Sequence, residues 1–297
     1  MASATTAAFR TSHMVLILVV ALVMPRDRSE VQALQQAAPR EARILFDSNR
    51  DGNFEIYVMD ADGSNQRRLT NSEGSEGPAW SPDRKRVAFT TSTGSIAVMD
   101  VDVANPHVLI RTEGEESGGP RWSPDGQRIA FKNLAEIYVM NADGSNPRRL
   151  TQFGGYGSEN PDWSPNGKAI AFDGRPPGTN RAIYFMEPDG SNIRRVTDDT
   201  VNSSHPRWSP DGQSLAFQSN RGGTTEVSIM DADGSNVRKL SSTPVGRSLN
   251  PAWSPDGKKI VFGSDRDENM EIYVMNADGT GLRNLTLNRA RDAHPDW

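Results

Sequence analysis

The stretch Pro251-Ala-Trp-Ser-Pro-Asp-Gly257 decides the fold, because this chain of 297 residues repeats it at a nearly constant spacing. Similar phrases surround four earlier tryptophans, and a sixth copy stops at Pro295-Asp-Trp297. The tryptophans follow one another at intervals of 41 to 45 residues: Trp80, Trp122, Trp163, Trp208, Trp253 and Trp297. Self-similarity with a period of about 40–45 residues is typical of solenoids and propellers.

The order of segments within one repeat separates these two architectures. After Trp122 come a turn at Pro124-Asp-Gly126, the apolar run Ile129-Ala-Phe131, the run Glu136–Met140, and a hairpin turn before Arg148-Arg149. With the strand around the tryptophan, these segments predict four short antiparallel strands and no helix. Because apolar residues occupy successive positions of the middle strands, both faces of the sheet are expected to be buried. A sheet buried between similar sheets is a propeller blade.

The fourth strand of the repeat carries pairs of basic residues. Charge on an outer strand discourages pairing with the edge of another sheet. The pairs are Arg67-Arg68, Arg148-Arg149, Arg194-Arg195 and Arg238-Lys239.

The two ends of the chain predict how the ring closes. The first recognisable segment, Arg43-Ile-Leu-Phe46, aligns with the second strand of the repeat, and the missing first strand matches His294–Trp297. We therefore predict an all-β fold, a six-bladed β-propeller of four-stranded antiparallel blades, with one composite blade built from both termini.

The tryptophan phrase, the Glu271-Ile-Tyr-Val-Met-Asn-Ala-Asp-Gly279 segment and the Arg-Arg-Leu-Thr endings together resemble the WD40-like (PD40) repeat of the TolB family. The resemblance covers about residues 42–297. It implies a six-bladed periplasmic propeller that binds a peptidoglycan-associated lipoprotein as part of the Tol–Pal envelope system. It does not extend to the N-terminal α/β domain of that family, because few residues precede the first blade. Similar repeats occur in prolyl-oligopeptidase-type enzymes, the tricorn protease and oligogalacturonate lyase.

The N-terminal segment is predicted to be a signal peptide. Its apolar run Met14–Met24 has eleven residues, whereas a helix that spans a bilayer needs about 20. We assign residues 1–33 to the signal peptide, with cleavage after Ala33, residues 34–41 to a flexible lead-in, and residues 42–297 to the propeller. An uncleaved N-terminal anchor is the alternative. With cleavage, the protein is periplasmic or secreted and its mature chain has no membrane span.

Composition excludes several classes of function. The chain has no cysteine, so it has no disulfides and no thiolate metal site or cysteine nucleophile. A net charge of -5 argues against general nucleic-acid binding. Asp47-Ser-Asn-Arg-Asp-Gly52 imitates a calcium loop, but position twelve is Val58 instead of glutamate, so we interpret the stretch as a turn. No hydrolase elbow, phosphate loop or zinc helix occurs, and we expect no cofactor and no catalytic residue.

One position of the repeat supplies the candidate binding residues. The residue before the proline of each tryptophan phrase is expected near the mouth of the central channel, and four of the six are polar. These four are His205, His294, Asn160 and Asn250. Three interpretations stay open: hydrogen-bonded loop residues, a rim that receives a partner segment, or a two-histidine metal site. His107 is placed in the turn before a fourth strand.

The other repeated residues have structural interpretations. Tryptophan in every blade favours packing between blades over a sugar-stacking platform. The repeated Asp-Gly pairs favour hairpin turns; their aspartates are Asp62, Asp143, Asp189, Asp233 and Asp278.

The sequence thus predicts a monomeric, non-catalytic scaffold whose channel-mouth loops bind a protein partner, such as an envelope lipoprotein or a peptide segment. Recognition through rigid loops is the common use of this fold. Two alternatives stay open: a carbohydrate or small-ligand module, and a hydrolase or lyase with an unrecognised site.

Overall fold

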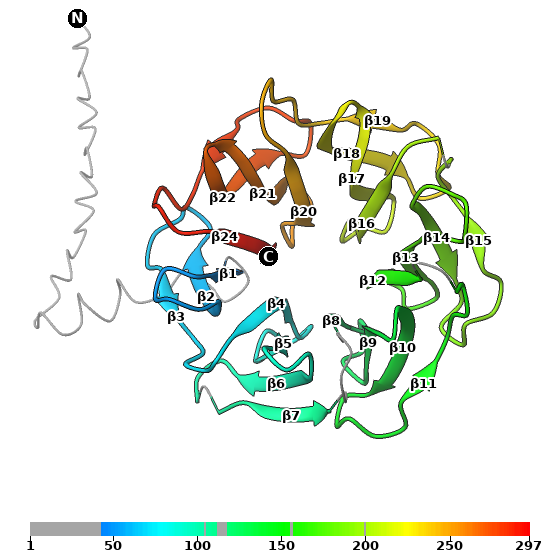
Figure 1. Ribbon diagram of the computed structural model, residues 1–297, viewed down its shortest axis with the longest axis horizontal. Coiled ribbons are helices and arrows are strands. Elements are labelled where there is room, and N and C mark those ends of the chain that lie inside the picture. Colours follow the sequence, from blue (N-terminus) through cyan, green and yellow to red (C-terminus); the bar gives the residue numbers. More distant parts are fainter. Residues whose placement is uncertain (1–42, 104, 112–117, 155–156, 199) are drawn as a thin grey trace, which may run out of the picture. The chain divides into compact units, whose positions relative to one another are not determined.

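The computed structural model describes residues 43–103, 105–111, 118–154, 157–198 and 200–297. The predicted signal peptide and lead-in lie outside these residues. Six four-stranded antiparallel sheets surround a common axis, with the inner strands facing the centre and the short fourth strands, of two to four residues, at the periphery (Figure 1). The predicted all-β, six-bladed propeller is confirmed, and the described part of the chain contains no helix that could cross a membrane.

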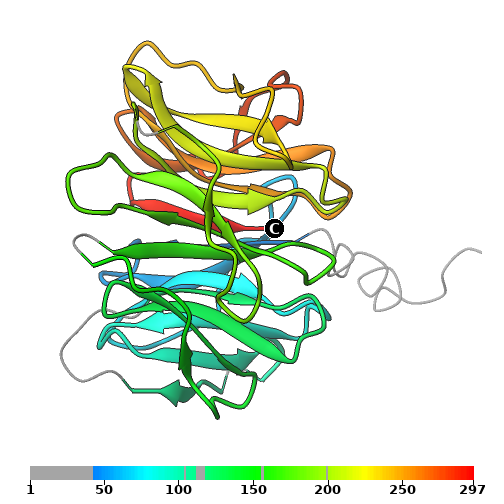
Figure 2. The same ribbon diagram turned by 90° about the vertical axis from the view of Figure 1, so that its right-hand side faces the viewer.

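The composite blade joins the two ends of the described chain (Figures 1 and 2). It consists of β24 (Asp292–Asp296), β1 (Arg43–Ser48), β2 (Glu55–Asp60) and β3 (Arg67–Arg68). β24 pairs antiparallel with β1, with Asp292 opposite Ser48. An ion pair of 2.9 Å between Arg50 Nη2 and Asp292 Oδ2 reinforces the closure. The ring is therefore closed by strand pairing, which protects sheet edges.

The other five blades follow in chain order. Blade 2 consists of β4 (Ser75–Trp80), β5 (Arg86–Thr91), β6 (Ile96–Asp100) and β7 (His107–Ile110). Blade 3 consists of β8 (Gly118–Trp122), β9 (Arg128–Asn133), β10 (Glu136–Asn141) and β11 (Arg148–Arg149). Blade 4 consists of β12 (Ser158–Trp163), β13 (Ile170–Gly174), β14 (Ala182–Met186) and β15 (Arg194–Arg195).

Blade 5 consists of β16 (Ser203–Trp208), β17 (Ser214–Gly222), β18 (Thr224–Asp231) and β19 (Arg238–Lys239). Blade 6 consists of β20 (Ser248–Trp253), β21 (Lys259–Asp267), β22 (Asn269–Asn276) and β23 (Arg283–Asn284). One placement was wrong: His107 opens the fourth strand of blade 2, opposite Val98, instead of lying in the preceding turn.

The tryptophans lie in six apolar cores, each of which combines two neighbouring blades. Trp253 of blade 6, for example, packs with Ala216 and Ile229 of blade 5. Trp297 of the composite blade packs against a cluster that contains Ile272 of blade 6. Because each side chain is buried between two sheets, packing of successive blades stabilises the ring, by about 1.5–3 kcal/mol for each large apolar side chain.

The two ends of the ring carry different connections. The end that carries the turns between second and third strands and the links from one blade to the next is called here the mouth face. The opposite end, the far face, carries the Pro-Asp-Gly and Asp-Gly turns. Asp143 there accepts a hydrogen bond of 2.9 Å from the Ser145 N–H, and this bond and that of the Ser145 hydroxyl lower the pKa of Asp143. The aspartates of the Asp-Gly pairs thus stabilise the hairpin turns in which they lie.

A buried glutamate at the beginning of the third strand joins consecutive blades on the mouth face. Glu226, for example, accepts hydrogen bonds from the Ser241 hydroxyl, the Thr243 N–H (2.8 Å) and the Ser248 hydroxyl (3.0 Å), so it contacts the link to blade 6 and its first strand. Glu55, Glu136 and Glu271 make the corresponding bonds to Thr70, Thr151 and Thr286. This bond set, called here the glutamate clasp, was not predicted from the sequence.

We expect Glu226→Ala to lower the free energy of unfolding by about 2–4 kcal/mol, because three buried donors lose their acceptor. Urea denaturation followed by tryptophan fluorescence measures the change. Glu73→Ala is the matched control: Glu73 is exposed on the same face, and the variant should stay within about 0.5 kcal/mol of the wild type. An equal effect of the two substitutions would show that the clasp does not stabilise the ring.

Candidate functional site

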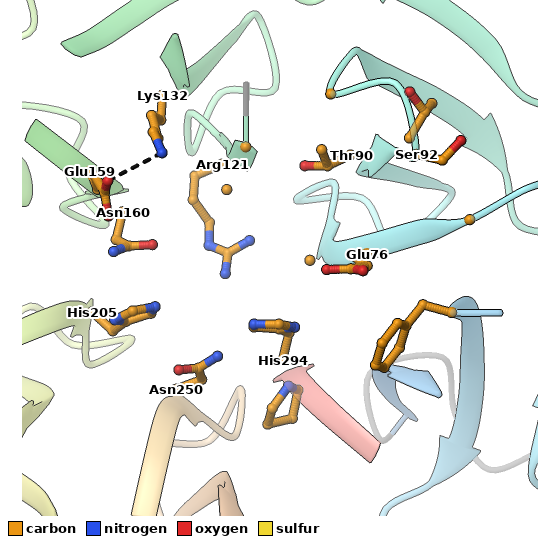
Figure 3. Close-up of a pocket in the computed structure, with 18 of the residues that line it drawn as sticks. Glu76, Thr90, Ser92, Arg121, Lys132, Glu159, Asn160, His205, Asn250 and His294 are labelled. Carbon is orange, nitrogen blue, oxygen red and sulfur yellow. Dashed lines mark ion pairs between the residues drawn. The ribbon is translucent and has the colours of Figure 1, made fainter. Parts of the chain in front are cut away.

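A cavity of about 580 Å³ opens at the centre of the mouth face (Figure 3). All six inner strands contribute to its lining the residue that precedes the proline of the tryptophan phrase. In ring order these residues are His294, Gly77, Gly119, Asn160, His205 and Asn250. The structure thus brings the four sequence-predicted rim residues together around one cavity.

Backbone conformation explains which residue types occupy this ring. All six residues have a positive φ, between 46° and 59°, at a point where the inner strand shifts its register against the second strand. Glycine adopts this left-handed conformation without strain, and asparagine and histidine are enriched among the other residues that do. The composition of the rim is therefore dictated partly by the fold.

The backbone N–H of these left-handed residues connects adjacent blades. The Gly77 N–H donates to Asp47 Oδ2 at 2.9 Å, and the His205 N–H donates to Asp173 Oδ1 at 2.9 Å. The Asn250 N–H donates to Gln218 Oε1 at 3.0 Å. Each acceptor follows the phenylalanine of the second strand in the preceding blade.

Two of these acceptors are buried aspartates that also hold a rim side chain of their own blade. Asp47 lies 2.8 Å from His294 Nδ1, and Asp173 accepts a hydrogen bond of 2.9 Å from the Asn160 amide. The Arg181 guanidinium forms an ion pair of 2.5 Å with Asp173. Asp47 belongs to β1 and not to the turn predicted for residues 47–52. Its role and that of Asp173 were missed, although both follow a second-strand phenylalanine.

His205 is neutral at physiological pH. Burial lowers the pKa of its imidazole to about 3, and the nearby positive charges of His294, Arg121 and Arg181 add to this shift. Its Nδ1 is buried and has no hydrogen-bond partner among the described residues. The ring points across the cavity toward His294, with Asn250 beside both (Figure 3).

His294 has the opposite electrostatic character. Burial opposes its protonation, but the charge and hydrogen bond of Asp47 outweigh that effect and raise the pKa of His294 above its ordinary 6.5. The two histidines thus differ because only the imidazole of His294 has a carboxylate partner.

A second ring comes from the residue between proline and tryptophan in each phrase. Asp162 Oδ2 accepts a hydrogen bond of 2.8 Å from the Trp208 N–H, and Asp296 Oδ2 accepts one of 2.9 Å from the Trp80 N–H. Burial raises the pKa of Asp296 and raises that of Asp162 to about 7. Arg121 and Arg207 occupy the same position in blades 3 and 5 and line the cavity. This ring was not predicted from the sequence, although the varying residue inside a constant phrase could have revealed it.

The cavity is chemically polar and mixed in charge. Lys132 pairs with Glu159 at 3.1 Å, and Arg181 lies 3.3 Å from the same carboxylate. In the described ranges no three histidine, aspartate or glutamate side chains gather as they would around a metal ion. The arrangement offers hydrogen-bond donors, acceptors and one unpaired guanidinium, which are groups suited to recognition.

Residues 92–248, more than half of the chain, match the family model of the TolB beta-propeller domain (PD40). The chain belongs to this family. A TolB homologue from Chlorobaculum tepidum is 52% identical over 52 residues, which span 17% of this chain and 12% of the relative. The crystal structure of TolB from Acinetobacter baumannii superimposes with a TM-score of 0.77 at 24% identity and covers 91% of this chain and 70% of that one.

The fold is also shared with an enzyme. Oligogalacturonate lyase in complex with manganese has a TM-score of 0.58 at 18% identity, over 83% of this chain and 74% of the lyase. At this identity the likeness shows the fold alone.

The two histidines provide a test of the cavity's electrostatics. In an NMR titration, His294 should titrate above pH 6.5, whereas His205 should show no titration between pH 5 and 8. Asp47→Asn should lower the pKa of His294, because the stabilising carboxylate charge is removed. The His294–Asp47 pair stabilises the fold more when His294 is protonated. This extra stabilisation is present below pH 6.5 and is lost as the pH rises through the raised pKa of His294. If both imidazoles titrated near 6.5 in the wild type, this description of the cavity would be wrong.

Proposed function

We propose that the propeller is a non-catalytic scaffold whose mouth face binds a segment of a protein partner. The observation that supports this most is the cavity of about 580 Å³ at the centre of that face, lined by polar side chains from every inner strand. A rigid ring presents these groups in a fixed geometry, so binding costs little conformational entropy on the side of the propeller.

Exposed apolar side chains on the mouth face support a protein as the partner. Leu134 is 52% exposed, Val245 64% and Leu287 81%. Leu134 and Ala135 form the hairpin turn of blade 3, and both have positive φ, which is costly for residues other than glycine and asparagine. Strained turns that hold an apolar side chain in solvent are expected at functional sites. Exposed apolar side chains on the face that surrounds a polar cavity fit a peptide segment inserted in the channel with its flanks on the mouth face.

The family match supports one class of partner, and we include that class in the proposal. The matched relatives include a protein named as the Tol-Pal system protein TolB. We infer that this chain is likewise exported to the periplasm or secreted, that it acts as a monomer, and that its partner is an envelope protein such as a lipoprotein.

A small-ligand or carbohydrate module is the second candidate, because the cavity volume lies within the range of small-molecule sites. Among its described lining residues, Phe54 is the one phenylalanine, tyrosine or tryptophan. Sugar rings are commonly stacked on aromatic faces, so a protein segment is the better fit.

Affinity capture from an envelope extract of the source cells tests the proposal. Leu287→Asp and Val245→Asp should each lower recovery of the partner about tenfold, since a charge replaces an apolar contact. Val103→Asp is the matched control: Val103 is 70% exposed but lies in a far-face turn, so this variant should recover the partner like the wild type. Quantitative mass spectrometry measures recovery. A set of captured proteins unchanged by the two mouth-face variants would refute the proposal.

A further inference from the structure

Arg121 is the cation in the cavity whose charge is least satisfied by the protein. Its guanidinium extends from the wall of blade 3 into the cavity, toward the side where His205, Asn250 and His294 lie (Figure 3). Its hydrogen bonds go to two backbone carbonyls, that of Pro120 at 2.8 Å and that of Pro78 at 3.4 Å. Its Nε is buried without a partner, and no carboxylate among the described residues lies within 4.0 Å of it.

The other cations that line the cavity have partners. Lys132 lies 3.1 Å from Glu159, and Arg207 lies 3.8 Å from Asp162. Arg121 interacts with Asp162 and Asp296 through longer-range attraction only. Because burial raises the pKa of Asp162 to about 7, its negative charge near neutral pH is incomplete, and burial also raises the pKa of Asp296. A partly buried guanidinium without a carboxylate partner is costly unless a ligand supplies the missing negative charge.

The opposite wall carries polar groups without internal partners. The Nδ1 of His205 has no partner, and no hydrogen bond of the Asn250 side-chain amide occurs within the described ranges. Their backbone N–H groups are already used by Asp173 and Gln218, so the Asn250 amide is free to face a ligand, while the buried Nδ1 of His205 is left without a partner. A planar guanidinium on one side and an amide donor on the other form a suitable frame for a carboxylate.

We propose that this frame binds one carboxylate of the partner segment, from an aspartate or glutamate side chain, between Arg121 and the wall formed by His205 and Asn250. The inference rests on the proposed function and specifies that the inserted segment carries a negative charge. A single negative charge fits better than a phosphate dianion, because Glu76 and Glu159 also line the cavity and would repel the second charge.

Two small peptides that differ only in charge test the carboxylate site. Isothermal titration calorimetry would compare acetyl-Gly-Asp-Gly-amide with acetyl-Gly-Asn-Gly-amide on the full chain. The wild type should bind the aspartate peptide at least about tenfold more tightly, the size expected for a charge-assisted bidentate contact. Arg121→Gln should abolish this preference, while Lys168→Gln, which removes an exposed far-face charge, should retain it.

A second variant keeps the test valid if Arg121→Gln does not fold. Asn250→Asp places a carboxylate opposite Arg121, and aspartate tolerates the φ of 55° at this position. It should lower the affinity for the aspartate peptide at least about tenfold by supplying the charge internally. Asn146→Asp adds the same charge at a φ of 54° in an exposed far-face turn, so it should keep the preference for the charged peptide.

The outcomes separate this inference from the proposed function. Equal affinity for the two peptides, or no binding of the aspartate peptide at about 10 mM, would overturn the carboxylate site. If the mouth-face variants still lowered partner recovery, the protein-binding function would survive that result. If the aspartate peptide bound as expected but partner recovery did not depend on the mouth face, the carboxylate site would stand and the protein-binding function would fall.

Discussion

The left-handed residue near the start of each inner strand is the constraint on which the rest of this propeller depends. Its positive φ bends the inner strand, and in three blades its N–H donates to a side chain of the preceding blade: Asp47, Asp173 or Gln218. The conformation admits few residue types, so the six positions hold two glycines, two asparagines and two histidines. The backbone conformation therefore limits which side chains can line the channel mouth.

The burial of charge in the channel follows from this geometry. Aspartates that bind a neighbouring blade's N–H lie where water is scarce, so burial raises the pKa of Asp162 and Asp173 to about 7 and about 6. His294 is protonated more easily because Asp47 contacts it, whereas His205 has no such partner and is neutral. One cation, Arg121, is left with backbone carbonyls as its hydrogen-bond partners. The interactions that close the ring thus also set the potential inside the cavity.

The sequence repeat made the fold predictable, but much of the site could not be predicted from it. The repeated tryptophan phrase predicted the strands, the turns and the number of blades. The segments that begin at Arg43 and His294 match complementary strands of the repeat, so they predicted the composite blade. Each of these signals is local in the sequence. Arg121 and Asp162 were missed since they occupy the varying position inside a constant phrase, and their approach to other blades depends on ring closure. The glutamate clasp was missed for the same reason: Glu226 reaches Ser248 across a blade boundary, which no spacing within one repeat reveals.

The central claim is that the fold needs the left-handed backbone at the rim, while the side chains of His205 and Asn250 are available for binding. The free energy of unfolding of the double variant His205→Gly/Asn250→Gly tests it most directly. Glycine adopts the required φ, and the N–H bonds to Asp173 and Gln218 are retained, so we predict a value within about 1 kcal/mol of the wild type. A loss of more than about 3 kcal/mol would contradict the claim, since it would show that these side chains serve the fold itself.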